Sequence, residues 1–196
     1  TDMSGLDRGF DRWEDHVIGP AMFLRSSWLS LSVTRPLLTG LGLFFGGPKD
    51  ASVVTGQFLS WLEAQQERRP FFAFLNYYDA HDPYVSPDSA AVFGSRPTEA
   101  WEDFLSSWRS DPAQSYTPET ARPWVNMYDN AIRYIDAYVG AILDTLEADG
   151  LTENTIVIVT SDHGEMWGEH GQLGHAQSLY LPALHVPLAV VYPGRV

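Results

Sequence analysis

The feature that most constrains the fold is a long amphipathic segment that leads directly into a β-branched one. Apolar side chains recur at a regular 4-3-4-3-4 spacing within residues 124–149: Tyr128, Ile132, Ile135, Val139, Ile142 and Leu146. This spacing places them on one face of a helix, and Gly150 follows as its C-terminal stop. Residues 155–161, with the sequence TIVIVTS, are then predicted to form a strand. The first expectation is therefore a long helix that packs against a sheet.

A second helix and two further strands are predicted around this unit. Asp50 can cap a helix that runs to about residue 68, because the apolar side chains of this segment follow a 3-4 spacing. The aromatic run FFAFLNYY at residues 71–78 is typical of a central strand buried on both faces. A third strand is predicted within residues 185–194. Because strand, helix and strand follow in this order, we expect an α/β fold with a parallel sheet covered by helices.

The segment between the first strand and the long helix is irregular. Residues 79–123 form an excursion rich in Pro and Ser, with one short amphipathic piece that contains Trp101, Phe104 and Trp108. Excursions of this length are usually functional or mobile. The chain of 196 residues has the length of one ordinary domain, so we expect residues 1–196 to belong to a single domain.

Charge and composition exclude several classes of function. The net charge is −13 and Lys49 is the only lysine. We expect no nucleic-acid partner, because proteins that bind nucleic acids present a basic surface. A metal or a few Arg and His side chains can still create a local anion site. The chain has no Cys, which excludes a disulfide, a thiolate metal site and a Cys nucleophile within these residues. The most apolar region, residues 22–48, is broken by Arg25 and Arg35, and its longest charge-free run, residues 36–48, is shorter than the roughly 18 residues of a membrane span.

Polar side chains follow two of the predicted strands. Asp79, His81 and Asp82 come after residues 71–78, whereas Asp162 and His163 come at the end of residues 155–161. Ligands of α/β sheets bind beyond the carboxyl ends of the strands. We therefore expect these side chains to form one common site.

Four segments, in this order, resemble segments of the sulfatases, which belong to the alkaline-phosphatase-like superfamily of metal-dependent ester hydrolases. They are GLDRGFDRWED at residues 5–15, FFAFLNYYDAHDPY at 71–84, YDNAIRYIDAYVGAILDTLEADGLTENTIVIVTSDHGE at 128–165 and GEHGQLGHAQSLYLPALHVPLAVVYPG at 168–194. The resemblance implies an alkaline-phosphatase-like sandwich, a parallel sheet with helices on both faces that is incomplete at the N-terminus. Residues 1–196 would then be one partial catalytic domain. The resemblance also implies a sulfuric ester hydrolase that acts on a sulfate ester of a small molecule or a glycan.

The resemblance assigns roles to four residues. Asp162 and His163 match two metal ligands of the family, and His81 and His175 match two positions that contact the ester oxygens. An imidazole such as that of His81 can also protonate the leaving group, because its pKa lies near neutrality. Many sulfatases have Asn in place of His163 and Lys in place of His175. An all-oxygen ligand set favours Ca²⁺ or Mg²⁺, whereas a nitrogen donor favours Mn²⁺ or Zn²⁺, so the sequence leaves the divalent metal open.

The nucleophile of the family is expected outside these residues. It lies in a Cys/Ser-x-Pro-x-Arg segment, and this segment and a pair of metal-binding aspartates precede the part that residues 5–15 resemble. The sequence SVTRPLLTG at residues 32–40 matches the nucleophile motif only weakly, and it follows GFD instead of preceding it. We therefore expect the chain to be inactive on its own.

Two alternative functions remain open from the sequence. His163 is also typical of a phosphodiester or phosphonate hydrolase, or of a phosphoglycerol transferase, of the same superfamily. A non-catalytic binding module that retains the fold is the alternative from another class. His170 is expected to order its loop. The sequence does not fix membrane association or localisation, and a periplasmic, extracellular or membrane-anchored protein is compatible with it.

Overall fold

The computed structural model describes residues 8–12, 49–65, 69–82, 84, 92–94, 116–175 and 178–193. The chain divides into two compact units, Thr1–Lys49 and Asp50–Val196, and all the elements below belong to the second unit. The weak nucleophile-like motif and the amphipathic piece with Trp101, Phe104 and Trp108 lie outside the described residues. The assignment of residues 1–196 to one domain stays a prediction.

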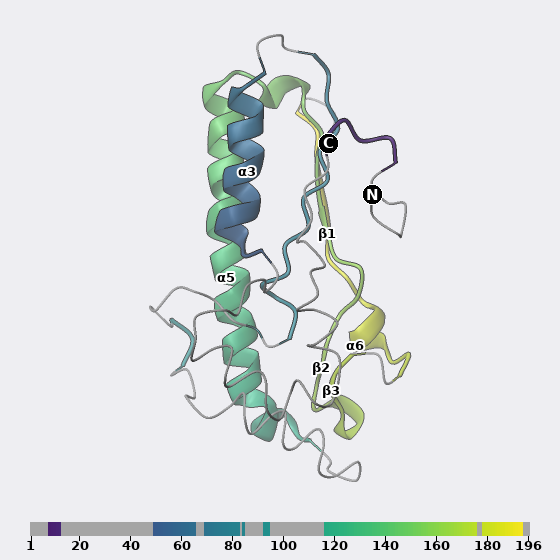
Figure 1. Cartoon of the computed structure of the whole chain (residues 1–196). Helices are drawn as coiled ribbons and strands as arrows, with labels where there is room; N and C mark the ends of the chain where they lie inside the picture. Colours follow the sequence, from purple (N-terminus) through teal and green to yellow (C-terminus); the bar gives the residue numbers. More distant parts are fainter. Residues whose placement is uncertain are drawn as a thin grey trace, which may run out of the picture. The chain divides into compact units, whose positions relative to one another are not determined.

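Helix α3, Ala51–Glu63, forms where the sequence predicts it (Figure 1). Asp50 caps it, because its Oδ1 accepts a hydrogen bond from the N–H of Val53 at 3.1 Å. The helix ends at Glu63, earlier than the predicted end near residue 68. Its buried side chains pack on helix α5, Pro118–Ala148, and the two helices share a core of four residues: Phe58, Leu62, Ile142 and Leu146.

Helix α5 begins at Pro118, whereas the sequence places its start near residue 124, after Pro123. That predicted start is wrong because the cap lies further upstream. Thr117 accepts a hydrogen bond from the N–H of Thr120 at 3.3 Å, and the Thr120 hydroxyl accepts one from the N–H of Thr117 at 2.9 Å. This reciprocal cap stabilises a helix start before Pro123, whose missing N–H removes only one helical hydrogen bond. Among the described residues, no helix has the length and hydropathy needed to cross a bilayer.

Strands β1, Val157–Thr160, and β4, Leu188–Val191, form within the predicted segments. They pair antiparallel, with Val157 opposite Val191 and Thr160 opposite Leu188, so the predicted parallel arrangement is wrong for this pair. A parallel pair needs a crossover of a dozen or more residues, usually a long helix. Between β1 and β4 the chain instead forms a small hairpin, β2 (Met166–Trp167) with β3 (Leu173–Gly174), and the short helix α6, Leu181–Leu184.

The aromatic run at residues 71–78 is not assigned as a strand. Phe72 and Phe74 are 75% and 67% exposed, so the predicted burial on both faces is also wrong. Aromatic residues favour strands only where neighbouring strands provide backbone pairing and packing. The described residues contain both helices and strands, as an α/β fold requires, whereas the sandwich with helices on both faces stays a prediction.

Candidate ester and metal site

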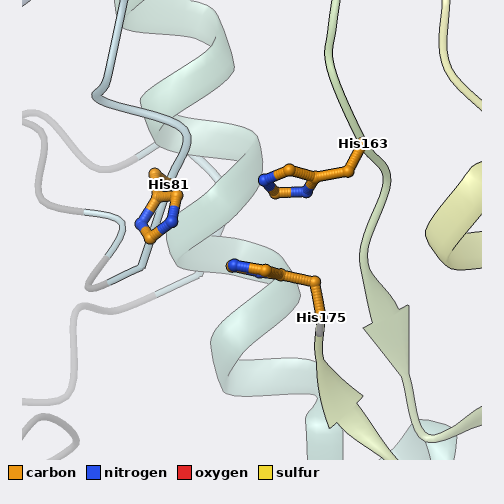
Figure 2. A group of neighbouring side chains, drawn as sticks. All are labelled: His81, His163 and His175. Atoms are coloured by element: carbon orange, nitrogen blue, oxygen red, sulfur yellow. The ribbon is translucent and has the colours of Figure 1, made fainter. Parts of the chain in front are cut away.

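Three histidines from separate segments meet at one place (Figure 2). His81 lies in the turn after residues 71–78, His163 follows β1, and His175 follows β3. The rings of His163 and His175 stack with centroids 4.1 Å apart, and the His81 centroid lies 4.9 Å from that of His175. One ring nitrogen of each histidine lies within 4.8 Å of the other two. The side chains that follow residues 71–78 and strand β1 thus lie together as expected, although residues 71–78 do not form a strand.

The Nδ1 atoms of all three rings have oxygen partners within the chain. His81 Nδ1 lies 2.9 Å from the carbonyl oxygen of Asp82 and 2.6 Å from its Oδ1. His163 Nδ1 lies 2.9 Å from the carbonyl oxygen of Gly164. His175 Nδ1 contacts Oε1 of Glu165. Carbonyl and carboxylate oxygens accept hydrogen bonds, so Nδ1 carries the hydrogen and Nε2 is left for a ligand in each ring.

Asp162 lies beside the three histidines and is not one of the group. Its side chain is 91% exposed, and its Oδ1 lies 3.8 Å from Nε2 of His163. The same Oδ1 accepts a hydrogen bond from the backbone N–H of His163 at 3.1 Å. Two metal bonds of about 2.1 Å can span up to about 4.2 Å. The donors of Asp162 and His163 therefore fit one cation, while their role as ligands stays a prediction.

Glu165 is a site residue that the sequence prediction missed. Its side chain is only 4% exposed, and its Oε1 contacts His175 and lies 3.8 Å from Nδ1 of His163. Its Oε2 accepts a hydrogen bond from the hydroxyl of Tyr84 at 2.5 Å. The available signal was its place directly after Asp-His-Gly at a strand end, but burial of the carboxylate depends on tertiary packing.

The acidic neighbours shift the titration of the site. The hydrogen bond that His81 donates to Asp82 raises the pKa of His81, although partial burial of the ring opposes this effect. The same hydrogen bond lowers the pKa of Asp82, with further lowering by His175 and His163. Burial raises the pKa of the Tyr84 phenol, and the Glu165 carboxylate adds to this effect. His81 thus keeps its positive charge to a higher pH than a free imidazole, which suits a group that faces an anion.

Two glycines hold the loop that carries these residues. Gly164 donates a backbone hydrogen bond to the carbonyl of Ala183 at 2.8 Å, and a Cβ on Gly164 would lie 2.0 Å from the carbonyl oxygen of Pro182. Gly168 has a φ of +102°, and a Cβ there would lie 2.4 Å from the carbonyl carbon of Thr117. The loop is therefore packed directly on the backbone of α6 and on the start of α5.

His170 lies in the same loop, outside the group of three histidines. Its ring stacks on that of Tyr180, with centroids 3.7 Å apart and an interplanar angle of 15°. Its φ of 53° is unusual for a residue with a side chain. These contacts agree with the predicted role of His170 in ordering the loop.

Comparisons with known proteins agree on one family. A family model described as Sulfatase matches residues 5–196. Arylsulfatase K from Bos taurus is 30% identical over 167 residues, which cover 71% of this chain and 31% of that protein. Human iduronate 2-sulfatase is 28% identical over 151 residues, which cover 64% of this chain and 27% of that protein. The chain thus spans about a third of the length of the curated relatives it matches. A solved structure of a protein in complex with its substrate D-glucosamine-2-N,6-O-disulfate has a TM-score of 0.43 and 17% identity, covering 74% of this chain and 43% of that one.

Proposed function

The chain belongs to the sulfatase family, and we propose that it forms part of the active site of a metal-dependent enzyme that hydrolyses a sulfate ester. The observation that carries this proposal is the meeting of His81, His163 and His175 with their Nδ1 atoms engaged. A sulfate ester resists attack because its oxygens carry negative charge. Hydrolysis needs a positively charged site for these oxygens, a nucleophile, and an acid for the leaving oxygen.

His81 and His175 are proposed to contact the ester oxygens. Their Nε2 atoms remain for a ligand because Asp82 and Glu165 engage the Nδ1 atoms. His81 is the better candidate to protonate the leaving oxygen, because the hydrogen bond that it donates to Asp82 raises its pKa. The proton would come from Nε2, while Nδ1–H stays bonded to Asp82.

Asp162 and His163 are proposed to hold a divalent metal. The separation of 3.8 Å between Asp162 Oδ1 and His163 Nε2 fits two ligands of one ion. The nitrogen donor favours Mn²⁺ or Zn²⁺, and Ca²⁺ or Mg²⁺ would require mainly oxygen ligands from elsewhere. When bound, the metal would neutralise charge on the ester oxygens.

The substrate class is proposed to be a small-molecule or glycan sulfate ester. The support is similarity to proteins named arylsulfatase K and iduronate 2-sulfatase. The 196-residue chain alone is proposed not to turn over such an ester, since the family's nucleophile motif is not found before the GFD segment. A phosphodiester or phosphonate hydrolase, a phosphoglycerol transferase and a binding module remain the alternatives.

The test assays the natural protein that contains these residues with 4-nitrophenyl sulfate, supplying Ca²⁺, Mg²⁺, Mn²⁺ or Zn²⁺ in turn. We expect hydrolysis, and we expect His81→Ala to lower kcat by about 10²-fold or more, as loss of a general acid does. His170→Asn is the matched control, because Asn tolerates a positive φ and His170 lies outside the group of three. Faster hydrolysis of a 4-nitrophenyl phosphodiester or phosphonate would instead support the alternative enzymes. Sulfate ester binding with no turnover of any of these esters would support the binding module.

A further inference from the structure

His175 has buried neighbours that can hold its ring in place, and their role rests on the proposed function because they belong to the same site. We propose that Glu165 and Tyr84 form a buried positioning pair for His175. The pair keeps the imidazole in one orientation and one tautomer, with Nδ1–H bonded to Glu165 and Nε2 directed at the ester oxygens.

The contacts form a continuous chain from the core to the site. The Tyr84 hydroxyl donates to Oε2 of Glu165 at 2.5 Å, and Oε1 of the same carboxylate contacts Nδ1 of His175. Counted as whole residues, Tyr84 and Glu165 are only 3% and 8% exposed. Each carboxylate oxygen therefore has a partner, which a buried carboxylate requires. Figure 2 shows the ring of His175 with its outer nitrogen directed toward His81.

The strand register explains why Glu165 and His175 meet. Strand β2 begins at Met166 and strand β3 ends at Gly174, and these two residues are opposite each other in the antiparallel pair. Glu165 and His175 flank this pair, so the hairpin brings them together although they are ten positions apart. Asp82 and Gly164 lie next in sequence to the histidines that they contact. The Nδ1 partner of His175 therefore depends on the pairing of β2 with β3, whereas those of His81 and His163 are sequence neighbours.

The position of Tyr84 is fixed by packing and by an unusual backbone conformation. Its ring contacts those of Tyr128 and Trp167, with centroids 5.8 Å and 5.4 Å away. Its φ of 54° lies in the left-handed region, which a bulky side chain rarely adopts. Such strain persists only where the surroundings impose it, and it is concentrated at functional sites. Here the conformation accompanies a phenol that lies in the core and donates to Glu165.

An imidazole needs such a partner because it presents two different nitrogens. A half-turn of the ring about χ2 exchanges the positions of Nδ1 and Cδ2, and either nitrogen can carry the hydrogen. Without an acceptor for Nδ1–H, a large share of the His175 population would not present Nε2 in the productive state. A carboxylate that accepts from Nδ1–H removes this ambiguity.

The test determines the tautomer of His175 in the natural protein that contains these residues, from long-range ¹H–¹⁵N NMR spectra at pH 8.5, where imidazoles are mainly neutral. We expect the Nδ1–H tautomer to dominate for His175 in the wild type. Glu165→Met keeps the length of the side chain but removes both acceptors. It should lower the ratio of Nδ1–H to Nε2–H on the order of tenfold, as expected for the loss of a hydrogen bond to a charged acceptor. Glu165→Gln retains an acceptor oxygen and should preserve more of the Nδ1–H form.

A dominant Nε2–H tautomer in the wild type would overturn the proposal, and this measurement requires no variant. An unchanged tautomer ratio in folded Glu165→Met would overturn it too. If Glu165→Met does not fold, Tyr84→Phe serves in its place, because it removes only the hydroxyl that orients Glu165. An unchanged His175 spectrum in Tyr84→Phe would then refute the role of Tyr84. The His170 resonances should stay unchanged in each variant. These results do not depend on turnover, so they are independent of whether the natural protein hydrolyses a sulfate ester.

Discussion

Gly164→Ala tests how the site loop is held against helix α6. The Cβ of the variant would lie 2.0 Å from the carbonyl oxygen of Pro182 and 3.0 Å from that of His185. Both obstacles are backbone atoms, which cannot turn aside as a flexible side chain can. The carbonyl of Pro182 and the loop would have to separate by about 1.0–1.4 Å, the difference between 2.0 Å and the 3.0–3.4 Å of tight contacts.

The cost has two parts. Overpacking of this kind costs about 1–3 kcal/mol. The separation also weakens the hydrogen bond of 2.8 Å from Gly164 N–H to the carbonyl of Ala183, which contributes about 0.5–1.5 kcal/mol. We expect the free energy of unfolding to fall by about 2–4 kcal/mol in total. At about 2–4 °C per kcal/mol for a domain of this size, Tm should fall by about 4–16 °C.

The measurement is urea and thermal unfolding of the 196-residue chain, followed by tryptophan fluorescence. The matched control is Gly140→Ala in the middle of α5, where a Cβ would have no neighbouring atom within 4 Å. Alanine favours a helix over glycine by about 0.5–1 kcal/mol, so this control should be more stable than the wild type. Equal stability of Gly164→Ala and the wild type would refute the close packing of the loop on α6. Because Gly164 lies between His163 and Glu165, the variant should also alter the His175 NMR signals.

Three further predictions concern the core, a buried carboxyl and the metal. Leu146→Ala should destabilise the chain by about 2–5 kcal/mol, because the Leu146 side chain is buried, with 4% exposed. Leu143→Ala on the same helix should cost far less, because Leu143 is 44% exposed. Equal losses of stability in urea unfolding would contradict the core between α3 and α5. Burial raises the pKa of Asp79, whose Oδ2 has no hydrogen-bond partner among the described residues. The stability contribution of this group is therefore present at low pH and lost as pH rises through the raised pKa. Asp79→Asn should be more stable than the wild type at pH 7 and should lose this advantage near pH 4. A difference in Tm that does not change with pH would contradict this prediction. His163→Ala should weaken the binding of Zn²⁺ or Mn²⁺, measured by calorimetry, about 10-fold or more, whereas His170→Asn should leave it unchanged. Equal affinities of the two variants would count against His163 as a metal ligand.

Local patterns predicted the presence of α3, α5 and β1. The 4-3-4-3-4 spacing located most of α5, and Gly150, with a φ of +65°, follows its C-cap as predicted. Asp50 caps α3 because capping depends on the residue and its next neighbours. The convergence of His81 and His163 was also predictable, because both follow segments that were expected to end at the same edge of a sheet.

Long-range pairing was not predictable in the same way. The antiparallel pairing of β1 with β4 depends on a reversal through the β2/β3 hairpin, and two-residue strands such as these leave no clear periodic pattern. The partners of Glu165 likewise come from Tyr84 and His175, which lie far from it in the sequence or across the hairpin. The start of α5 was placed too late because Pro123 was treated as a boundary, although the Thr117 cap outweighs the loss of one hydrogen bond.

An anion site in a chain with a net charge of −13 requires that nearby carboxylates not face the anion. Among the described residues, Asp82 and Glu165 make the shortest carboxylate contacts with the histidine rings, and both meet this requirement in the same way. Asp82 contacts Nδ1 of His81 and Glu165 contacts Nδ1 of His175, so each carboxylate lies behind an imidazole. The ring then separates the carboxylate from the space that Nε2 faces, and at His81 the hydrogen bond to Asp82 also raises the pKa of the imidazole. Acidic residues can thus strengthen the proposed binding of a sulfate ester, provided that the histidines keep the orientations that these contacts impose.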